Sequence, residues 1–196
     1  MASSATDRYG PVSVVIHWVI AVLIFVQIGL GWWMNEVLPD HTPVQARVQN
    51  VHISLGLTIL ILVLLRIGVR LTHPGPPLPP EMAEWEKFLA RVSHALFYLL
   101  MLVLPLSGWA LVSLGKHPIH FWGLPWPHLP GTAQIFGPTP PRPLRHAVSH
   151  VHVYILIWIV LLNLALHVVG ALKHQFDGHP VLWRMTGQAR PQGTRR

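Results

Sequence analysis

The stretch VVIHWVIAVLIF, residues 14–25, places one histidine inside an otherwise apolar run. The whole run from Val12 to Met34 contains no Asp, Glu, Lys or Arg, and a transmembrane helix needs about 20 consecutive, mostly apolar residues. Polar side chains within such helices are costly in hydrocarbon, so they usually face the interior of a helix bundle and mark function. The stretch therefore predicts a membrane helix, and it raises the question of what His17 binds.

Three further runs have the same character. Residues 52–65, 92–114 and 147–172 contain no charged side chain, and the apolar pattern of the first of these continues past Arg66. Across the chain, 52% of the residues are hydrophobic and only 11% are charged, whereas soluble domains carry about 25% charged residues. The sequence predicts an all-α fold, a bundle of four transmembrane helices in a single domain covering residues 1–196.

The positions of the expected elements follow from these runs and from the prolines between them. Proline and glycine in HPGPPLPPEM (73–82) end any helix, and the proline-rich segments are interpreted as connections. The amphipathic segment AEWEKFLARVS (83–93) is expected to lie at the inner membrane surface before the third helix, in which Pro105 should produce a kink. The expected helices span about residues 11–35, 45–72, 91–114 and 144–175, with an outer loop at 115–143 and an inner tail at 176–196.

The distribution of basic residues predicts the orientation. The formal net charge is +7, but the basic residues lie near the ends of the apolar runs and in the loops, so we reject a nucleic-acid partner. Four of the 14 Lys and Arg residues fall on the predicted outer side, namely Arg47, Lys116, Arg142 and Arg145, and the rest fall on the other side. The positive-inside rule then places both termini in the cytoplasm. The first apolar run is expected to remain as a helix, because it is too long for a signal-peptide core.

The absence of cysteine limits the chemistry. Without thiolates there are no disulfides, no cysteine-held iron–sulfur clusters and no covalent attachment of c-type haem. Any metal must therefore be bound by histidine, carboxylate or neutral oxygen ligands.

Six of the 14 histidines lie within the apolar runs, and four of them fall into two levels. His17 and His167 are expected near the inner side, whereas His52 and His152 are expected near the outer side. Each level thus has two histidines from different helices. His152 and His167 lie about 60° apart around one helix and roughly 22 Å apart along its axis, so that helix can contribute one ligand to each level. His150, two residues before His152, points farther from the face of His167 but remains an alternative.

Two neutral imidazoles that face each other across a helix bundle suit the axial positions of a haem iron. A porphyrin is broad and flat, so the side chains beside each ligand on the helix surface must be small. The neighbouring residues are small: Ser13 and Ala21 beside His17, Gly56 after His52, Ser149 before His152, and Gly170 and Ala171 after His167. The pattern predicts two haem groups at two depths.

Other interpretations remain open. Each histidine considered alone fits a hydrogen-bonded core residue. A proton relay usually includes a carboxylate, and the four uncharged runs contain none. His117, His120 and His128 in the outer loop offer a zinc or copper site, although they lack a tight metal-binding spacing.

Four stretches together resemble the bacterial cytochrome b561 family, in order and over nearly the whole chain. The most specific parts are H-x-x-x-G followed by R-x-x-x-R in the second run, and H-x(6)-H in the fourth. The stretches are IHWVIAVLIF (16–25), VHISLGLTILILVLLRIGVRL (51–71), SHALFYLLMLVLPLSGWALVS (93–113) and LALHVVGALKHQF (164–176). The resemblance implies a multi-pass protein of the bacterial inner membrane with two haem b groups.

The resemblance also implies a ligand set. His17 and His167 would hold the cytoplasm-side haem, and His52 would share the outer haem with a histidine near the start of the fourth helix. In many members the two histidines of that helix are one residue closer together than His152 and His167 are. A local helix irregularity would absorb this residue and keep His152 as the ligand, with His150 as the alternative.

Several further residues are candidates for contacts with haem propionates or quinone. The resemblance implies such a role for His94 and His174. Arginine suits carboxylates, which adds Arg66 and Arg70 at the inner level and Arg47 at the outer level. Anchoring of these side chains at the membrane interface is the alternative.

The resemblance implies two classes of function. The first is a free-standing di-haem cytochrome, an oxidoreductase that passes single electrons to or from ubiquinone; some members oxidise superoxide at the outer face. The alternative is a cytochrome b anchor, the electron-accepting subunit of a partner dehydrogenase or hydrogenase. A third possibility, a membrane protein without haem, would be distinguished by its colourless spectrum.

Overall fold

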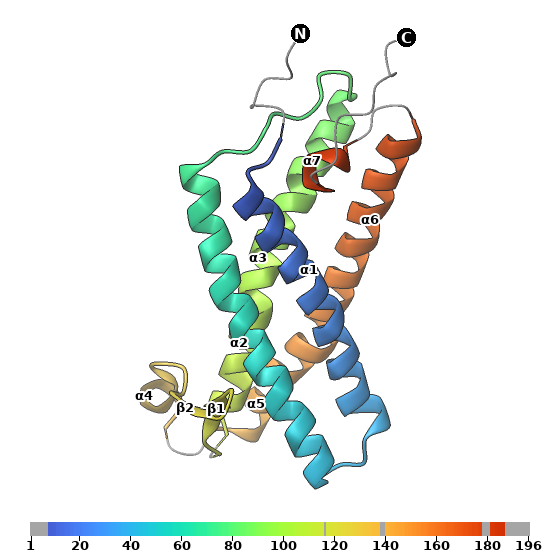
Figure 1. The fold of residues 1–196 in the computed structure, drawn as a ribbon. Helices are drawn as coiled ribbons and strands as arrows, with labels where there is room; N and C mark the ends of the chain where they lie inside the picture. Colours follow the sequence, from blue (N-terminus) through green and yellow to red (C-terminus); the bar gives the residue numbers. More distant parts are fainter. Residues whose placement is uncertain (1–7, 116, 138–139, 178–180, 187–196) are drawn as a thin grey trace.

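Four long helices dominate the computed structural model, which describes residues 8–115, 117–137, 140–177 and 181–186 (Figure 1). Each is long and apolar enough to cross a membrane: Pro11–Val37, Pro43–Thr72, Glu84–Ser113 and Arg142–Phe176. The predicted all-α bundle of four membrane helices is therefore confirmed. Only 6% to 22% of each apolar window is buried within the chain, which leaves apolar side chains available for contact with lipid.

Two of these helices begin with proline. Helix α1 (Pro11–Trp32) and helix α2 (Pro43–Thr72) both carry proline in the first turn, where its missing N–H group has no cost. The Thr42 side chain also accepts a hydrogen bond from the Gln45 backbone N–H at 3.2 Å, which caps α2. A short π-helical segment, η2 (Trp33–Val37), continues α1 to its end.

Helix α3 (Glu84–Ser113) begins earlier than expected. The segment 83–93 does not form a separate surface element, because its helical residues are the first turns of α3. Glu86 accepts a hydrogen bond from the Ala83 backbone N–H at 3.1 Å, and acidic residues in a first turn are stabilised by the helix dipole. At 1.5 Å per residue α3 is about 45 Å long, so it extends beyond a hydrocarbon core of ~30 Å. Pro105 lies inside α3 without ending it.

The fourth membrane helix contains an irregularity. It consists of α5 (Arg142–His150), the π-helical segment η3 (Val151–Leu156) and α6 (Ile157–Phe176). A π-helical segment accommodates an extra residue in a helix and often occurs at functional sites. The irregularity expected between the two histidines of this helix is therefore present.

The segment between α3 and α5 is more than a connection. Strands β1 (Ile119–Phe121) and β2 (Leu124–Trp126) pair antiparallel, with Ile119 opposite Trp126. Trp122 and Gly123 form the turn with φ values of 50° and 86°, as in the type I′ turns of tight hairpins. Helix α4 (Thr132–Phe136) follows. The prediction of a plain connection is wrong here, because backbone pairing across a two-residue turn leaves little sequence signal when proline and tryptophan surround it.

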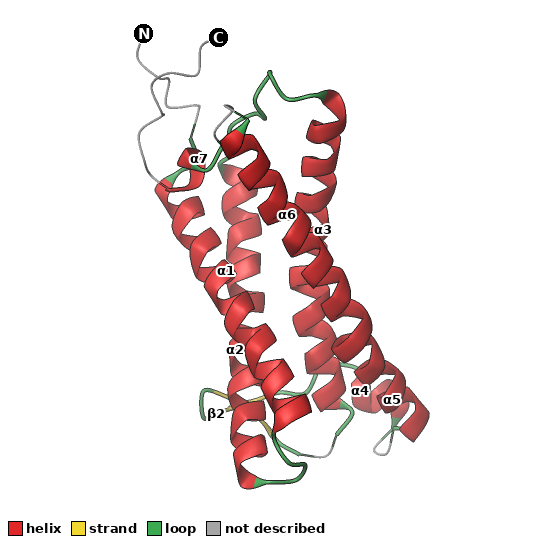
Figure 2. Cartoon of the chain, turned by 90° about the vertical axis from the view of Figure 1, so that its right-hand side faces the viewer, coloured by secondary structure: helices red, strands yellow, loops and turns green. Residues whose placement is uncertain are grey.

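The helices form two layers. Figure 2 shows α1 beside α2 and α3 beside α6, and the buried core divides in the same way. One cluster, Ile20, Ile59 and Val63, joins α1 to α2. The other, Leu100, Leu156 and Val160, joins α3 to η3 and α6. The described part of the chain therefore has two small apolar cores.

The two ends of the bundle differ. Helix α1 begins, and helix α6 ends, at the end that carries the short helix α7 (Trp183–Thr186), which we call the α7 end (Figure 1). Strands β1 and β2 lie at the opposite end, which we call the hairpin end. Helix α7 lies within the expected inner tail, most of which falls outside the described residues. Lys116, in the outer loop, also falls outside them.

Candidate functional site

The two expected pairs of histidines are brought together. At the α7 end the ring centroids of His17 in α1 and His167 in α6 are 6.4 Å apart. At the hairpin end the ring centroids of His52 in α2 and His152 in η3 are also 6.4 Å apart. Each pair takes one histidine from the layer of α1 and α2 and the other from the layer of α3 and α6. The pairs therefore join the two layers at two depths.

This separation agrees with a metal ion between two imidazoles. Imidazole binds transition metals through one ring nitrogen at ~2.0–2.1 Å, so two rings on opposite sides of one ion have centroids about 6.3 Å apart. Rings on a common nitrogen–metal–nitrogen axis turn freely about it, and the observed interplanar angles of 59° and 87° are both compatible with that arrangement. The residues present fit a bis-histidine haem at each level.

At the hairpin end, glycines make room for the rings. A Cβ atom at residue 31 would lie 3.4 Å from Cε1 of His52, and one at residue 108 would lie 3.0 Å from Cε1 of His152. Gln27 donates a hydrogen bond to the His52 carbonyl oxygen at 2.8 Å. The Nδ1 atom of His52 is buried and has no hydrogen-bond partner among the described residues. Nδ1 of His52 is therefore left available, and the close approach of Gly31 leaves room for the ring.

The choice between His152 and His150 follows from the π-helical segment. The His150 ring is exposed and lies against Tyr154, with centroids 5.2 Å apart, whereas the His152 ring meets His52. With one residue absorbed by η3, His152 and His167 behave as if fourteen residues apart, which reduces their angular offset from about 60° to about 40°. The geometry favours His152 as the partner of His52.

At the α7 end, Arg66 contacts His17. Its guanidinium group donates to Nδ1 of His17 at 3.3 Å and to the Ser13 carbonyl oxygen at 3.2 Å. A guanidinium has no acceptor, so Nδ1 of His17 accepts here and its ring proton is on Nε2. If Nε2 is to bind a metal, that proton must move to Nδ1 and Arg66 must turn away. An arginine released in this way suits a carboxylate.

A third histidine also lies at this level. The ring of His94 in α3 lies 5.4 Å from that of His167, which is closer than His17 is. The Phe97 ring also packs edge-on against the His167 ring, with centroids 5.2 Å apart. His94 is thus adjacent to the α7-end pair, and it is also exposed to a neighbouring pocket.

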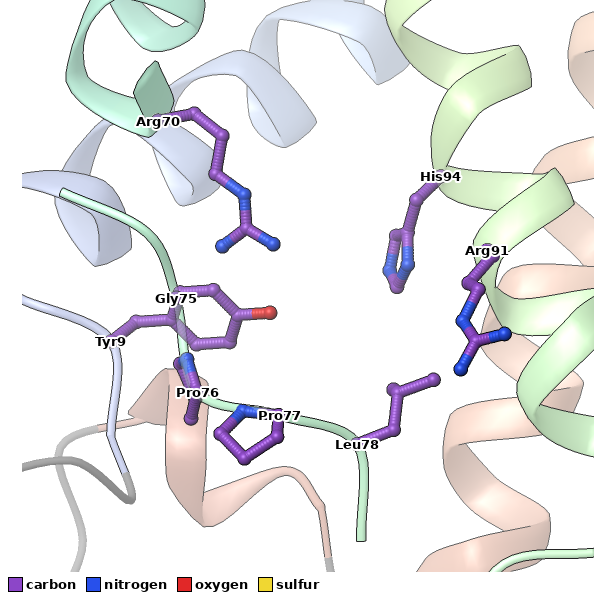
Figure 3. A pocket seen from close by; sticks show the side chains of 8 residues that line it. All are labelled: Tyr9, Arg70, Gly75, Pro76, Pro77, Leu78, Arg91 and His94. Carbon is purple, nitrogen blue, oxygen red and sulfur yellow. The ribbon is translucent and has the colours of Figure 1, made fainter. Parts of the chain in front are cut away.

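That pocket, about 420 Å³ in volume, opens at the α7 end. Figure 3 shows Arg70 from α2, His94 from α3 and Tyr9 from the N-terminal arm around one space. Arg70 lies over the Tyr9 ring at 5.7 Å, and any side chain at Gly75 would overlap both of them. The pocket combines cationic and hydroxyl groups with a wall of prolines, which suits an amphipathic ligand that has a polar head.

The other candidates lie apart from these groups. His174 lies seven residues after His167 on α6 and does not line the pocket. Arg47 is exposed near the start of α2 at the hairpin end. The loop histidines His117, His120 and His128 do not come together, since no group of three or more metal-binding side chains forms among the described residues.

One contact beside the site, between Asn163 and Ser93, was indicated only weakly by the sequence. Asn163, 3% exposed, pairs with Ser93 through two hydrogen bonds, Ser93 Oγ to Asn163 Oδ1 at 3.0 Å and Asn163 Nδ2 to Ser93 O at 3.2 Å. Asn163 precedes His167 by one turn, and Ser93 precedes His94. The side-chain amide of Asn163 inside an apolar run could have predicted this contact, because polar residues in membrane helices often form hydrogen bonds with neighbouring helices.

Replacing Asn163 with leucine should therefore destabilise the protein. The change removes both hydrogen bonds between α3 and α6, and such bonds contribute about 0.6 to 1.7 kcal/mol in membrane proteins. Thermal unfolding in detergent should show a lower midpoint. A double-mutant cycle with Ser93→Ala isolates the pairwise part, and an Asn163→Leu protein as stable as the parent would contradict the assignment.

Comparison with known proteins identifies similar chains. The family model described as prokaryotic cytochrome b561 matches residues 8–188. The chain is 27% identical to cytochrome b561 homolog 2 of Escherichia coli (strain K12) over 188 residues, 95% of both chains. It is 30% identical to the probable superoxide oxidase CybB of Yersinia pestis over 123 residues, 62% of this chain and 67% of that protein. It is 23% identical to cytochrome b561 homolog 1 of E. coli (strain K12), over 87% of this chain and 91% of that protein.

Proposed function

Because the chain belongs to the prokaryotic cytochrome b561 family, we propose that it carries single electrons between two haem b groups and exchanges them with membrane quinone. Membership makes it a bacterial membrane protein of electron transfer that binds b-type haem. The number of haems, their ligands and the electron partners belong to the proposal. We further propose that the membrane is the inner membrane and that both termini are cytoplasmic, as the basic residues predict.

The observation that carries the proposal is the presence of two histidine pairs with equal ring separations at two depths. We assign His17 and His167 to the haem at the α7 end, and His52 and His152 to the haem at the hairpin end. These four histidines would hold the two groups, and a haem bound between two imidazoles would supply one-electron transfer there. The protein places the rings, and the buried apolar clusters that include Ile20 and Leu156 exclude water from the interior of the bundle.

Arg66 has a separate role in this proposal. It occupies the Nδ1 side of His17 and also bonds to the Ser13 carbonyl oxygen, which lies one turn earlier and is an acceptor suited to an Nδ1–H group. We assign Arg66 and Arg70 to the propionate carboxylates of the haem at the α7 end. Arg47, at the hairpin end, is the corresponding candidate there.

The pocket at the α7 end supports quinone exchange. It is open, it is next to His94, and its polar groups and proline wall suit a quinone head and the start of its tail. His174 remains a candidate for the same exchange through its position on α6, although it does not line the pocket. Ubiquinone is the partner that we propose.

Filling this pocket should block quinone exchange without removing haem. Leu78→Trp adds bulk to a lining residue and is expected to raise the KM for a soluble ubiquinol analogue at least tenfold, about 1.4 kcal/mol of lost binding. The matched control is Leu71→Trp, since Leu71 is 78% exposed and does not line the pocket. Equal KM values for the two variants would exclude this pocket as the quinone site.

Superoxide is the proposed electron donor at the hairpin end. A relative is named a probable superoxide oxidase, and Arg47, Arg142 and Arg145 are all exposed in this chain. Exposed basic residues at one end raise the local concentration of small anions. The same end also offers a surface for a partner dehydrogenase or hydrogenase, because Leu124 and Ile135 are 67% and 72% exposed. Purification of a stoichiometric partner with the chain would favour that alternative.

Two measurements test the proposal. Haem quantification with a reduced-minus-oxidised spectrum should show two b-type haems per chain, and a single haem would refute the di-haem assignment. Stopped-flow mixing of the oxidised protein with superoxide should then reduce the haems, and quinone should reoxidise them. Haems that stay oxidised after superoxide is added would reject superoxide as the donor while leaving the di-haem assignment intact.

A further inference from the structure

Ser107 of α3 makes two short contacts with its hydroxyl group. Its Oγ lies 2.8 Å from the Leu104 carbonyl oxygen and 2.8 Å from Nδ1 of His152. A carbonyl oxygen only accepts, and a serine hydroxyl has one proton to donate. A hydroxyl that makes both contacts as hydrogen bonds donates to Leu104 and accepts from Nδ1 of His152. The Leu104 backbone also lies within hydrogen-bonding reach of the His152 ring.

This arrangement determines where the His152 proton is. Because Oγ accepts, Nδ1 of His152 donates, and a neutral imidazole carries only one proton. Nε2 of His152 is then unprotonated and has a free lone pair, which is the state required of a metal ligand. Two of the other histidines lack this support, since Nδ1 of His52 has no partner among the described residues and Nδ1 of His17 faces the Arg66 guanidinium.

The adjacent residue holds the same ring from its edge. Gly108 leaves space for Cε1 of His152, which lies between the two ring nitrogens, and a Cβ atom there would be 3.0 Å away. Ser107 and Gly108 thus orient the ring together, one through a hydrogen bond and the other through close approach. His152 comes from η3, so this contact also fixes the position of the π-helical segment against α3.

We propose that Ser107 is a positioning residue that holds His152 with Nδ1 protonated and Nε2 free to bind iron. The proposal rests on the proposed function, in which His152 is a haem ligand. A hydrogen bond from the second ring nitrogen makes an imidazole ligand more basic, and a more basic ligand stabilises oxidised iron. Ser107 therefore lowers the reduction potential at the hairpin end.

The test is a potentiometric titration of Ser107→Ala beside the parent protein. The spectral component that His152→Ala lacks identifies the haem concerned. In Ser107→Ala that component should remain, but its reduction equilibrium should shift about tenfold toward the reduced form, which is ~59 mV upward for one electron. Ser107→Thr, which keeps the hydroxyl, should restore the parent potential, whereas Ser107→Val, of the same shape without it, should not.

Ser93→Ala is the matched control, because it removes a hydroxyl from the same helix at the other level. It should leave the potential of the hairpin-end component unchanged. If Ser107→Ala and Ser107→Val both titrate like the parent while His152→Ala lacks one component, the role of Ser107 is refuted and the ligand assignment stands. If His152→Ala retains both components, the ligand assignment itself fails, and the role of Ser107 fails with it.

Discussion

His17→Ala and His167→Ala should each yield a protein with one haem per chain, and the haem that remains should be the same in both. The two rings form the pair at the α7 end, so removing either leaves the iron with a single axial imidazole. Loss of one of two ligands weakens metal binding by several kcal/mol, because each contributes a directed bond that water replaces poorly. Haem quantification and the α-band spectrum of the purified variants measure the result.

Two further variants make this test decisive. His94→Ala removes the ring that lies closest to His167 and should retain two haems, because we assign His94 to the pocket. His150→Ala removes an exposed ring that faces Tyr154 and should also retain both. If His94→Ala loses the same haem as His167→Ala while His17→Ala retains it, the axial pair at the α7 end is His94 with His167 instead.

Gly108→Val should remove the haem at the hairpin end while leaving the other. The new Cβ atom would lie 3.0 Å from Cε1 of His152, and the valine methyl groups would extend farther into the space of the ring. The ring cannot retreat without breaking its contact with Ser107. Overpacking of this kind costs about 1–3 kcal/mol, and a displacement of about 1 Å is enough to spoil a positioned site. Haem content should fall from two to about one.

Gly29→Val is the matched control for Gly108→Val. Gly29 is an exposed residue of α1, and a Cβ atom there would meet nothing within 4 Å. Gly29→Val should retain both haems. Its thermal stability should not fall, because glycine has a lower helix propensity than every other residue except proline. Loss of haem from both glycine variants would show that the effect is general to the helices. Two haems in Gly108→Val would show that the site at His152 tolerates the added bulk.

Much of the architecture follows from local properties of the chain. A helix that crosses a bilayer must satisfy its own backbone hydrogen bonds, so the length of each apolar run predicts a membrane helix with little reference to the others. Alternating directions of successive helices then place His17 with His167 at one depth and His52 with His152 at the other. The structure brings each pair together, with ring centroids 6.4 Å apart, and the ligand roles stay predictions.

Other features depended on contacts between distant segments. The start of α3 at Glu84, the pairing of β1 with β2 and the bond between Asn163 and Ser93 were not expected from the sequence. In each case the local sequence favours the observed conformation only weakly, and a residue elsewhere in the chain stabilises it. Glu86, for example, bonds both to Ala83 and to Lys173 of α6, the latter at 2.8 Å.

The difference between what the sequence determined and what tertiary packing determined has a physical cause. Transfer of apolar side chains into lipid is a property of each segment, so the number of helices, their approximate lengths and the depth of each histidine could be read from the order of residues. Which ring nitrogen carries a proton, which of two nearby histidines faces His52, and how close a backbone comes to a ring depend on atoms from other helices. Ser107, Gly108 and the π-helical segment Val151–Leu156 act on His152 only after α3 and the fourth helix have packed together.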